Sequence, residues 1–282
     1  MENAHEDGNL IWRLLLILVL AGAQAAAEDV AKPASGMLTK DQFLPGFDAI
    51  CASGQNLSEG CTAIRERRLV SPESFPWRAI GRLNFAGIDI RQHCTGTLVG
   101  ESVVLTASHC LYSAARKRWI APGSLTFAAG YRQGAALAVA QGVRYVLDPV
   151  LDPSSRDFRA KPAQDWALVF LDSPIGQEVG VLTVSDDTGR AVLAGYSGLR
   201  PHVLSVADDC GEWRMDADWQ VGLARCSAMQ GDSGAPILID TADGPKLVGV
   251  LSVVRVDSDQ TAWSVGVPSK TFLPALEEMQ AQ

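Results

Sequence analysis

The stretch "MQGDSGAP", residues 229–236, places Ser233 between an acidic residue and a glycine. A serine hydroxyl is a poor nucleophile unless a base removes its proton, and that base is usually a histidine, whose ordinary pKa lies near neutrality. The chain has 4 histidines, and none of them follows Ser233. Because an α/β-hydrolase needs the order serine, acid, histidine, that fold is excluded with Ser233 as its nucleophile. Its G-x-S-x-G turn also fails, since position 235 is an alanine.

His109 is the best placed of the histidines to act as the base. It lies in "VVLTASHCLY", residues 103–112, where an apolar strand runs into small residues and then into the histidine and Cys110. The strand and the cysteine would hold the imidazole rigidly. His93 lies in a polar loop and His202 follows a proline, so both are predicted to be solvated surface histidines, while His5 falls within the N-terminal targeting segment.

An acid that orients the base must be buried and must accept a hydrogen bond from the far imidazole nitrogen. Asp165, in "AKPAQDWALVFLD", comes directly before a strongly apolar strand at 166–171, so its backbone is expected to enter the core. A turn aspartate at the strand edge is the alternative. The residues around the serine fit the same chemistry, because Gly231 can point its N–H inward and the N–H of Ser233 would be a second donor to an oxyanion.

From about residue 70 onward the chain is a succession of short apolar runs bounded by Gly, Pro, Asp and Ser. The runs have the length and the Val and Leu content of strands, which favours an all-β sandwich or barrel. The predicted strands are 77–83, 96–100, 102–107, 124–130, 143–147, 166–171, 190–196, 235–240, 246–254 and 262–268. The single good helix is "SKTFLPALEEM", residues 269–279, with Ser269 as its cap and one apolar face formed by Phe272, Leu273, Leu276 and Met279.

The N-terminal segment is typical of a secretory signal peptide. "LLLILVLAG", residues 14–22, is an apolar run preceded by Arg13, and the small residues that follow offer cleavage after Ala25 or Ala27. The run is shorter than the roughly 20 apolar residues that a membrane-spanning helix needs. We therefore expect a secreted or periplasmic protein without stable membrane association after cleavage. An uncleaved signal anchor is the alternative, because the residues before the run are unusually acidic.

The net charge and the cysteine content further restrict the class of protein to which this chain can belong. The formal net charge of −8 argues against a nucleic-acid-binding protein, because proteins of that class usually carry an excess of basic residues. An even number of cysteines behind a signal peptide favours disulfides, and the absence of a C-x-x-C spacing argues against zinc, so no metal is expected. Pairing between sequence neighbours is one of many possibilities. The neighbouring pairs are Cys51 and Cys61, Cys94 and Cys110, and Cys210 and Cys226.

Several stretches together resemble the trypsin/chymotrypsin-like serine proteases. They follow the family's order of histidine, aspartate and serine and span about residues 70–275. The resemblance implies two antiparallel β-barrels, followed here by the C-terminal helix, with a triad in the cleft between the barrels. It also implies hydrolysis of peptide bonds through an acyl-enzyme, without a cofactor. The stretches are "CTGTLVGESVVLTASHC" (94–110), "QDWALVFL" (164–171), "GDSGAPI" (231–237) and "LVGVLSVV" (247–254).

The resemblance assigns roles to the members of this triad. His109 would be the general base, Asp165 would orient it, and Ser233 would attack the scissile carbonyl. The Cys94–Cys110 pair resembles the family disulfide that braces the histidine loop.

The resemblance also implies which residues surround the reacting carbonyl. Gly231 and Ser233 resemble the oxyanion-hole donors, and Ser252 resembles the main-chain position that pairs with an extended substrate. Ser227 is the nearest equivalent of the base of the specificity pocket. Ser108 precedes the histidine at a position where the family usually has alanine.

The spacing between one cysteine and Ser233 indicates which branch of the family the sequence resembles. Cys226 precedes Ser233 by 7 residues, which is similar to the bacterial glutamyl-endopeptidase-like branch, and Cys210 fits as its partner. That branch often reads a substrate glutamate with a histidine at the position where Leu251 stands here. The resemblance therefore does not extend to glutamate specificity.

Asp232 matches the position that, in zymogen-type relatives, pairs with a newly freed N-terminal amine. Cleavage after Arg68, the last residue of "RERR", would free Leu69, and a solvated basic loop is the alternative interpretation of this cluster. The expected segments are a signal peptide (1–27), a lead segment that could be a propeptide (28–68) and the protease domain (69–282).

Other functions stay open at this point. A catalytically inactive binding protein on the same fold would keep the motifs but have blocked geometry. A non-peptidase serine hydrolase is disfavoured by the missing downstream histidine, and a structural envelope protein would leave the motifs as coincidence. We expect a monomer that binds protein or peptide substrates and no nucleic acid.

Overall fold

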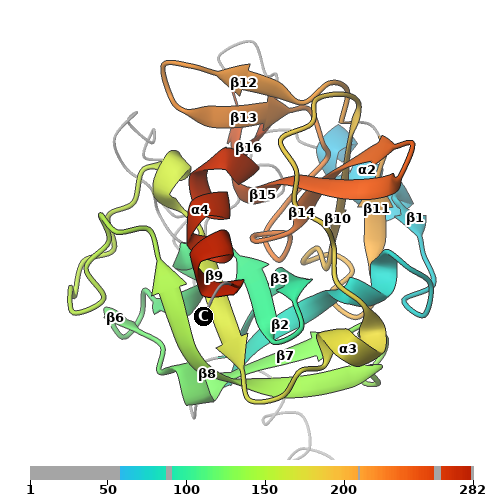
Figure 1. Cartoon of the computed structure of the whole chain (residues 1–282). Coiled ribbons are helices and arrows are strands. Elements are labelled where there is room, and N and C mark those ends of the chain that lie inside the picture. The colour runs from blue at the N-terminus through green and yellow to red at the C-terminus, as the bar shows by residue number, and fades with distance from the viewer. Residues whose placement is uncertain (1–57, 87–90, 209, 257–261, 281–282) are drawn as a thin grey trace, which may run out of the picture. The chain divides into compact units, whose positions relative to one another are not determined.

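The computed structural model describes residues 58–86, 91–208, 210–256 and 262–280, all within the unit Leu38–Gln282 (Figure 1). The predicted signal peptide, residues 1–27, and most of the predicted lead segment lie outside the described residues. Most of the described elements are strands, and they fall into two groups along the chain.

Strands of the first half close into an antiparallel barrel in the order β2-β3-β4-β9-β8-β7. Alternate residues of a strand face the barrel interior, so the large side chains of Leu83, Phe85 and Phe127 are buried. Gly81 is needed beside Phe127, because a Cβ at this position would lie 2.4 Å from the ring. The strands are β2 (Ile80–Ala86), β3 (Arg91–Gly100), β4 (Val103–Thr106), β7 (Leu125–Ala129), β8 (Ala138–Leu147) and β9 (Ala167–Leu171).

A second antiparallel sheet has the order β1-β11-β10-β14-β15-β16-β13-β12. Its end strands β1 and β12 are not paired with each other within the described residues, so hydrogen bonds do not close it as they close the barrel. Trp213, Ile237 and Val248 lie in its buried core. The strands are β1 (Arg68–Leu69), β10 (Ala191–Gly195), β11 (Ser205–Ala207), β12 (Arg214–Asp216), β13 (Val221–Ala224), β14 (Pro236–Thr241), β15 (Gly244–Val256) and β16 (Ala262–Pro268).

The predicted all-β, chymotrypsin-like fold is confirmed, and every predicted strand region overlaps a strand of the structure, although the first three residues of the region 77–83 form a short helix. The structure differs from the prediction in one respect. Hydrogen bonds close only the first of the two predicted barrels. The strands β11, β12 and β13 were not predicted, since they are short and lack a run of large apolar residues. The connecting elements are α2 (Ser58–Glu66), η1 (Trp77–Ala79), η2 (Ser108–Leu111), β5 (Tyr112–Ser113), β6 (Arg118–Trp119), η3 (Pro122–Ser124), η4 (Pro162–Gln164) and α3 (Gly176–Val179).

The predicted C-terminal helix is α4 (Ser269–Gln280). Phe272 and Leu276 of its predicted apolar face are buried, at 0% and 3% exposed, while Leu273 and Met279 pack against the same core from its margin. The ring of Phe272 lies 6.3 Å from that of Trp166, measured between centroids. The helix is therefore fixed against the residue that follows Asp165.

Disulfides join Cys94 to Cys110 and Cys210 to Cys226, as the neighbouring-pair interpretation predicts. Cys61 is also disulfide-bonded, and Cys51 lies outside the described residues. Both described disulfides join segments that are 16 residues apart and lie next to the functional motifs.

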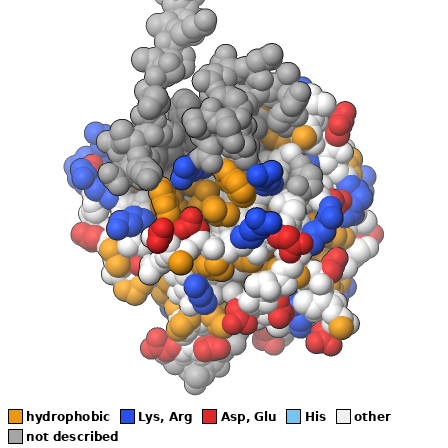
Figure 2. All heavy atoms as spheres, turned by 90° about the horizontal axis from the view of Figure 1, so that it is seen from above, with side chains coloured by type: hydrophobic (Ala, Val, Ile, Leu, Met, Phe, Trp, Pro, Cys, Tyr) orange, Lys and Arg blue, Asp and Glu red, His pale blue; other side chains and the backbone are white. Residues whose placement is uncertain are grey.

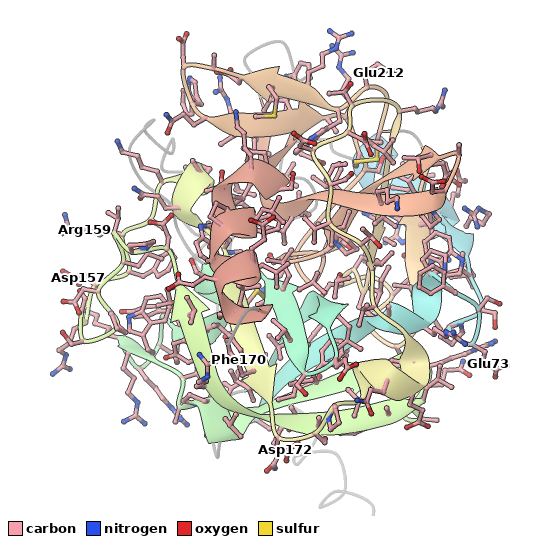
Figure 3. All side chains as sticks on the ribbon, viewed as in Figure 1. Glu73, Asp157, Arg159, Phe170, Asp172 and Glu212 are labelled. Carbon is pink, nitrogen blue, oxygen red and sulfur yellow. A yellow bond between two sulfur atoms is a disulfide. The ribbon has the colours of Figure 1, made fainter. Side chains whose placement is uncertain are left out.

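Most charged side chains of the described residues are exposed or half-buried, and Arg67, Asp165 and Asp232 are among the few that are buried. Glu73, Asp172 and Glu212 project from its surface, and the Asp157 carboxylate lies 3.7 Å from the Arg159 guanidinium (Figure 3). On the face shown in Figure 2, basic and acidic side chains are interspersed, so neither sign of charge forms a continuous patch there. Among the described residues, no helix has both the length and the apolar character needed to cross a membrane.

Candidate active site

His109 is held at the end of a barrel strand. The strand β4 ends at Thr106, and His109 is the second residue of the short helix η2 that follows. The disulfide between Cys94 of β3 and Cys110 ties this turn to the neighbouring strand. Because His109 is only 3% exposed, its ring has little freedom to reorient.

Asp165 lies directly after η4 and before β9, and it is fully buried at 0% exposed. Its carboxylate accepts 4 hydrogen bonds. His109 donates two of them, from Nδ1 at 2.7 Å and from its backbone N–H at 2.9 Å. The hydroxyls of Ser108 and Ser252 donate the others, at 2.8 Å and 2.6 Å. The structure thus brings Asp165 and His109 together, and places Ser252 with them.

These contacts decide the charge of the carboxylate and the tautomer of the ring. Burial alone would raise the pKa of Asp165, but the neighbouring His109 and the hydrogen bonds from His109 and Ser252 outweigh it, so the pKa lies below its ordinary value. An ionised carboxylate only accepts hydrogen bonds, so Nδ1 of a neutral His109 must carry the ring proton. The basic nitrogen of that ring is then Nε2.

Two of the donors to Asp165 are serine hydroxyls whose partner the sequence does not reveal. Ser252 lies at an irregularity of β15, between Leu251 and Val253, where the pairing with β16 shifts by one residue. The sequence assigns Ser252 only to main-chain contact with a substrate, and Ser108 only to a departure from alanine. No local sequence pattern indicates which group these hydroxyls contact, so only the fold identifies them as donors to Asp165.

Ser233 lies in a turn between β13 and β14 that is bound to the first barrel through Thr95 of β3. The N–H of Thr95 donates to the carbonyl oxygen of Ser233 at 2.9 Å, and its hydroxyl donates to that of Gly231 at 2.9 Å. Gly234 lies against the end of β4, because a Cβ there would be 2.2 Å from the Thr106 hydroxyl. The serine turn is therefore packed against the strand that leads into the histidine. Sequence reasoning missed Thr95, which has the appearance of an ordinary strand residue.

The same turn presents two N–H groups. The carbonyl that precedes Gly231 accepts from the N–H of Gly198 at 2.6 Å, so the Gly231 N–H, on the opposite side of this trans peptide, points the other way. The carbonyl that precedes Ser233 accepts from the N–H of Ala235 at 2.8 Å, with the same consequence for the Ser233 N–H. Among the described residues, neither N–H donates to a backbone carbonyl. Gly231 has φ +95°, and a Cβ there would lie 2.4 Å from the carbonyl oxygen of Tyr196.

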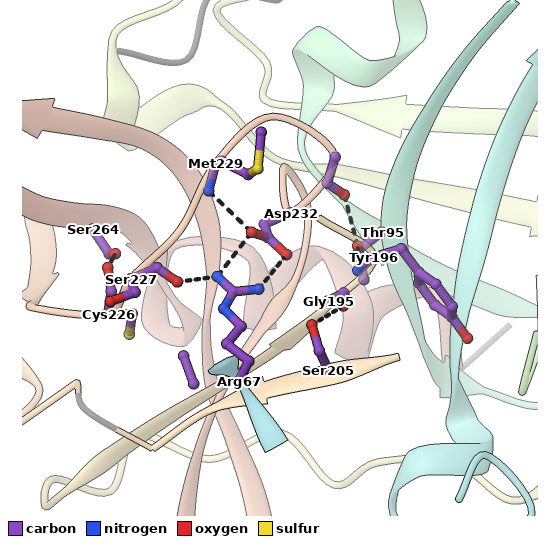
Figure 4. A network of polar contacts seen from close by, with 12 residues as sticks. Arg67, Thr95, Gly195, Tyr196, Ser205, Cys226, Ser227, Met229, Asp232 and Ser264 are labelled. Atoms are coloured by element: carbon purple, nitrogen blue, oxygen red, sulfur yellow. Dashed lines mark hydrogen bonds and ion pairs between the residues drawn. The ribbon is translucent and has the colours of Figure 1, made fainter. Parts of the chain in front are cut away.

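Asp232, between these two donors, is paired with Arg67 (Figure 4). Nη1 and Nη2 of Arg67 each donate to a different carboxylate oxygen of Asp232 at 2.9 Å. Nη2 also donates to the carbonyl oxygen of Ser227, the residue predicted at the base of the specificity pocket. The side chain of Arg67 is 1% exposed and that of Asp232 is 0% exposed. The sequence predicts Arg67 to be part of a lead segment and does not predict this ion pair.

The remaining described histidines lie apart from Asp165. His93, predicted to be solvated, is half-buried, and its Nε2 donates to the carbonyl oxygen of Tyr196 at 3.1 Å. Burial, and next the charge of Arg82, lower the pKa of His93 below its ordinary value. His202 is exposed as predicted, and its Nδ1 lies 2.8 Å from the Tyr131 hydroxyl.

Cys94, His109 and Cys110 are close enough together to suggest a metal site, because their ligand atoms lie within 4.8 Å of one another. The two sulfur atoms are bonded to each other, however, and a disulfide offers no thiolate ligand. The two cysteines therefore form a disulfide that holds the short helix carrying His109.

Comparison with solved structures gives similar folds among proteases. A Glu endopeptidase solved in complex with MPD is 22% identical with a TM-score of 0.59, over 77% of this chain and 97% of its own. The protease Anisep from Arthrobacter nicotinovorans is 20% identical with a TM-score of 0.53, over 72% of this chain and 96% of its own. The thermostable serine protease AL20, from an extremophilic microorganism, is 20% identical with a TM-score of 0.51, over 68% of this chain and 91% of its own.

At these identities the likeness concerns the fold. It confirms the predicted similarity to glutamyl endopeptidases at that level. No curated protein matches the sequence. The trypsin family, in contrast, matches residues 64–276, which is most of the chain. The protein therefore belongs to the trypsin family of serine proteases.

Proposed function

We propose that the protein is a secreted serine endopeptidase that hydrolyses protein or peptide substrates through an acyl-enzyme. The observation that supports this best is the 2.7 Å hydrogen bond from Nδ1 of His109 to the buried carboxylate of Asp165. It provides an oriented base whose Nε2 accepts a proton, next to the turn that presents Ser233. Two described serines contact this carboxylate, Ser108 and Ser252; both donate to it and are buried.

In the acylation step, Nε2 of His109 takes the proton of the Ser233 hydroxyl as Oγ bonds to the substrate's carbonyl carbon. The electron pair of the C=O bond moves to oxygen, and the N–H groups of Gly231 and Ser233 bind this oxyanion. Asp165 stabilises the imidazolium that has formed. The imidazolium then gives its proton to the leaving nitrogen as the C–N bond breaks, and the acyl group stays on Oγ.

Deacylation runs the same transfers with water as the nucleophile. Nε2 of His109 takes a proton from water, and the hydroxide oxygen bonds to the acyl carbon. The second oxyanion collapses, the bond to Oγ of Ser233 breaks, and Oγ recovers a proton from the imidazolium. The carboxylic acid product leaves, and both side chains return to their starting protonation.

Export is supported by the predicted signal peptide together with the disulfides of the described residues, since disulfides persist in oxidising compartments. The experiment is N-terminal sequencing of the protein recovered from outside the cytoplasm. Cleavage after Ala25 or Ala27 is expected, and a chain retained in the cytoplasm with its first residues intact would contradict export.

An inactive binding protein of the same fold is the competing function, and labelling distinguishes the two. A fluorophosphonate probe should form an adduct on Ser233 in the wild-type protein, and casein should be cleaved. Ser233→Ala should abolish both, while Ser154→Ala, at an exposed serine, should retain both. His109→Ala should slow labelling nearly as severely, because nucleophile and base act as a unit. A folded wild-type protein that is neither labelled nor proteolytic would leave the binding protein as the better account.

A further inference from the structure

Arg67 reaches the serine turn from a part of the chain that precedes the barrels. It follows α2, whose Ile64 is 0% exposed and lies in the same apolar cluster as Ala228 and Ala235, on either side of the turn. After it, Arg68 and Leu69 form β1 and pair with β11. Arg67 is thus anchored on both sides within the second half of the protein, although the sequence suggests a separate lead segment.

The guanidinium and the carboxylate are matched in geometry and in charge. Each partner uses two atoms, which makes the contact bidentate and directional. Removing both charges from water is costly, and the ion pair offsets this cost only while both partners are present. Gly195 leaves the room for the pair, because a Cβ at that position would lie 2.4 Å from Oδ1 of Asp232.

The pair also fixes the backbone that carries the two N–H donors. Oδ2 of Asp232 accepts from the N–H of Met229 at 3.0 Å, and the N–H of Asp232 donates to the carbonyl oxygen of Met229 at 3.0 Å. Gly231 and Ser233 are the residues on either side of Asp232. A rotation of the Asp232 side chain would break its hydrogen bond from Met229 and so remove one constraint on the turn that carries both N–H groups.

We propose that Arg67 is a positioning residue for catalysis: its guanidinium, supplied by the uncut chain, holds Asp232 and thereby the Gly231–Ser233 donors in their binding orientation. The inference rests on the proposed function. It replaces the expectation that cleavage after Arg68 frees an amine at Leu69 to pair with Asp232. The carboxylate is already paired in the intact chain, and Leu69 is 55% exposed in β1. Cleavage after Arg67 or Arg68 would then impair the enzyme.

Two other titratable or charged groups of the described residues lie near the ion pair. His93 of β3 is close enough to feel the charge of Asp232. Arg200 donates from Nη1 to the carbonyl oxygen of Arg67 at 3.3 Å. Neither forms a direct contact with the carboxylate of Asp232, so the guanidinium is its cationic partner.

The first test uses the wild-type full chain. Protein labelled by a fluorophosphonate is denatured, and its N-terminus and intact mass are measured. We expect the labelled chain to contain Arg67. A labelled population that begins at Arg68 or Leu69 would overturn the proposal. A wild-type protein with no label at all would instead count against the proposed function, so the two failures are distinguishable.

The second test compares Arg67→Ala with Arg68→Ala, the neighbouring arginine, whose ion pair with Asp208 is exposed. Arg67→Ala should lower kcat by about 10²–10³-fold with a smaller change in KM, the size of losing an oxyanion donor. Added methylguanidine should restore part of that loss. Arg68→Ala should retain the wild-type kcat. An Arg67→Ala protein with wild-type kcat would refute the positioning role.

The third test remains decisive if Arg67→Ala does not fold. A guanidinium stays charged above pH 12, whereas an N-terminal amine loses its proton near pH 8 and a lysine near pH 10.4, as approximate values. Wild-type kcat should therefore hold between about pH 8 and pH 10, while Arg67→Lys should be active near neutrality and lose activity at alkaline pH. Loss of wild-type kcat through about pH 8–9 would identify an amine at Asp232 and contradict the proposal.

Discussion

The two buried aspartates of this protein have opposite kinds of partner. Asp165 and Asp232 are both 0% exposed. Asp165 receives its hydrogen bonds from an imidazole, two serine hydroxyls and a backbone N–H. Asp232 receives two of its hydrogen bonds from the permanently charged guanidinium of Arg67.

The difference explains how one protein uses a buried carboxylate for two purposes. Hydroxyl and N–H donors stabilise the charge of Asp165 without cancelling it, so this charge still acts on the His109 ring when the ring becomes an imidazolium. A guanidinium cancels the charge of Asp232 in the resting state and fixes its orientation. We infer that Asp165 contributes mainly to the reaction rate, and Asp232 mainly to the shape and stability of the serine turn.

Asp165→Asn should produce the largest kinetic effect. The amide of the new side chain would donate toward Nδ1, so the neutral ring of His109 would carry its proton on Nε2 and lose its basic position. A fall in kcat of about 10⁴-fold is expected, measured on a peptide substrate at pH 7. The unfolding free energy should change less than in the Asp232 variant, because the groups left behind are neutral. A loss of kcat below tenfold would remove the orienting role of Asp165.

Asp232→Asn should lower kcat as Arg67→Ala does, and among these variants it should have the largest effect on stability. It leaves the Arg67 guanidinium buried without a counter-charge, at a cost of about 3–5 kcal/mol in unfolding free energy. Chemical denaturation measures this directly. The matched control is Asp208→Asn, which breaks the exposed pair with Arg68 and should cost about 0–1 kcal/mol. Equal effects of the two substitutions would show that the Arg67–Asp232 pair is not the buried contact described above.

Acid should reveal the ionised state of Asp165. Because its folded-state pKa lies below the unfolded value, ionisation of Asp165 stabilises the fold above about pH 4, and this contribution is lost as the pH falls through the folded-state pKa. Denaturation curves between about pH 7 and pH 2 should therefore show a steeper acid loss in the wild type than in Asp165→Asn. Parallel curves for the two proteins would contradict a lowered pKa.

Ser108→Ala should have the smallest effect. It removes one hydroxyl donor from Asp165 and keeps the other three contacts. It also introduces the residue that the family usually has at this position. A loss of about 0.5–1.5 kcal/mol in unfolding free energy is expected, with kcat reduced less than tenfold. Ser252→Ala, at the 2.6 Å contact, is the companion variant and should be more damaging. A Ser108→Ala loss as large as that of Asp165→Asn would mean that the hydroxyl has a separate role.

The fold and the central pair were predictable because their signals are local. His109 closely follows an apolar strand, Asp165 closely precedes one, and strand-length apolar runs recur along the chain. Such patterns survive without knowledge of the partner. The short strands β11 and β12, with only three residues each, have too little sequence to show a pattern.

The second set of contacts depends on tertiary structure. Arg67 and Asp232 are 165 residues apart, and an arginine in a basic cluster has the appearance of a solvated or cleavable residue. Ser252, which contacts Asp165, lies at the irregularity in β15, and the apolar sequence of that strand does not signal either feature. Pairings of this kind depend on how distant elements pack, so local composition does not contain them.

The central claim is that His109 activates Ser233 to form an acyl-enzyme, and pre-steady-state hydrolysis of p-nitrophenyl acetate tests it most directly. We predict a burst of nitrophenolate of about one equivalent per chain. Peptide mapping of acid-quenched protein should place the acetyl group on Ser233. The burst should disappear in Ser233→Ala and become much slower in His109→Ala. Turnover without a burst, or an acetyl group mapped to another residue while Ser233→Ala stays active, would contradict the account.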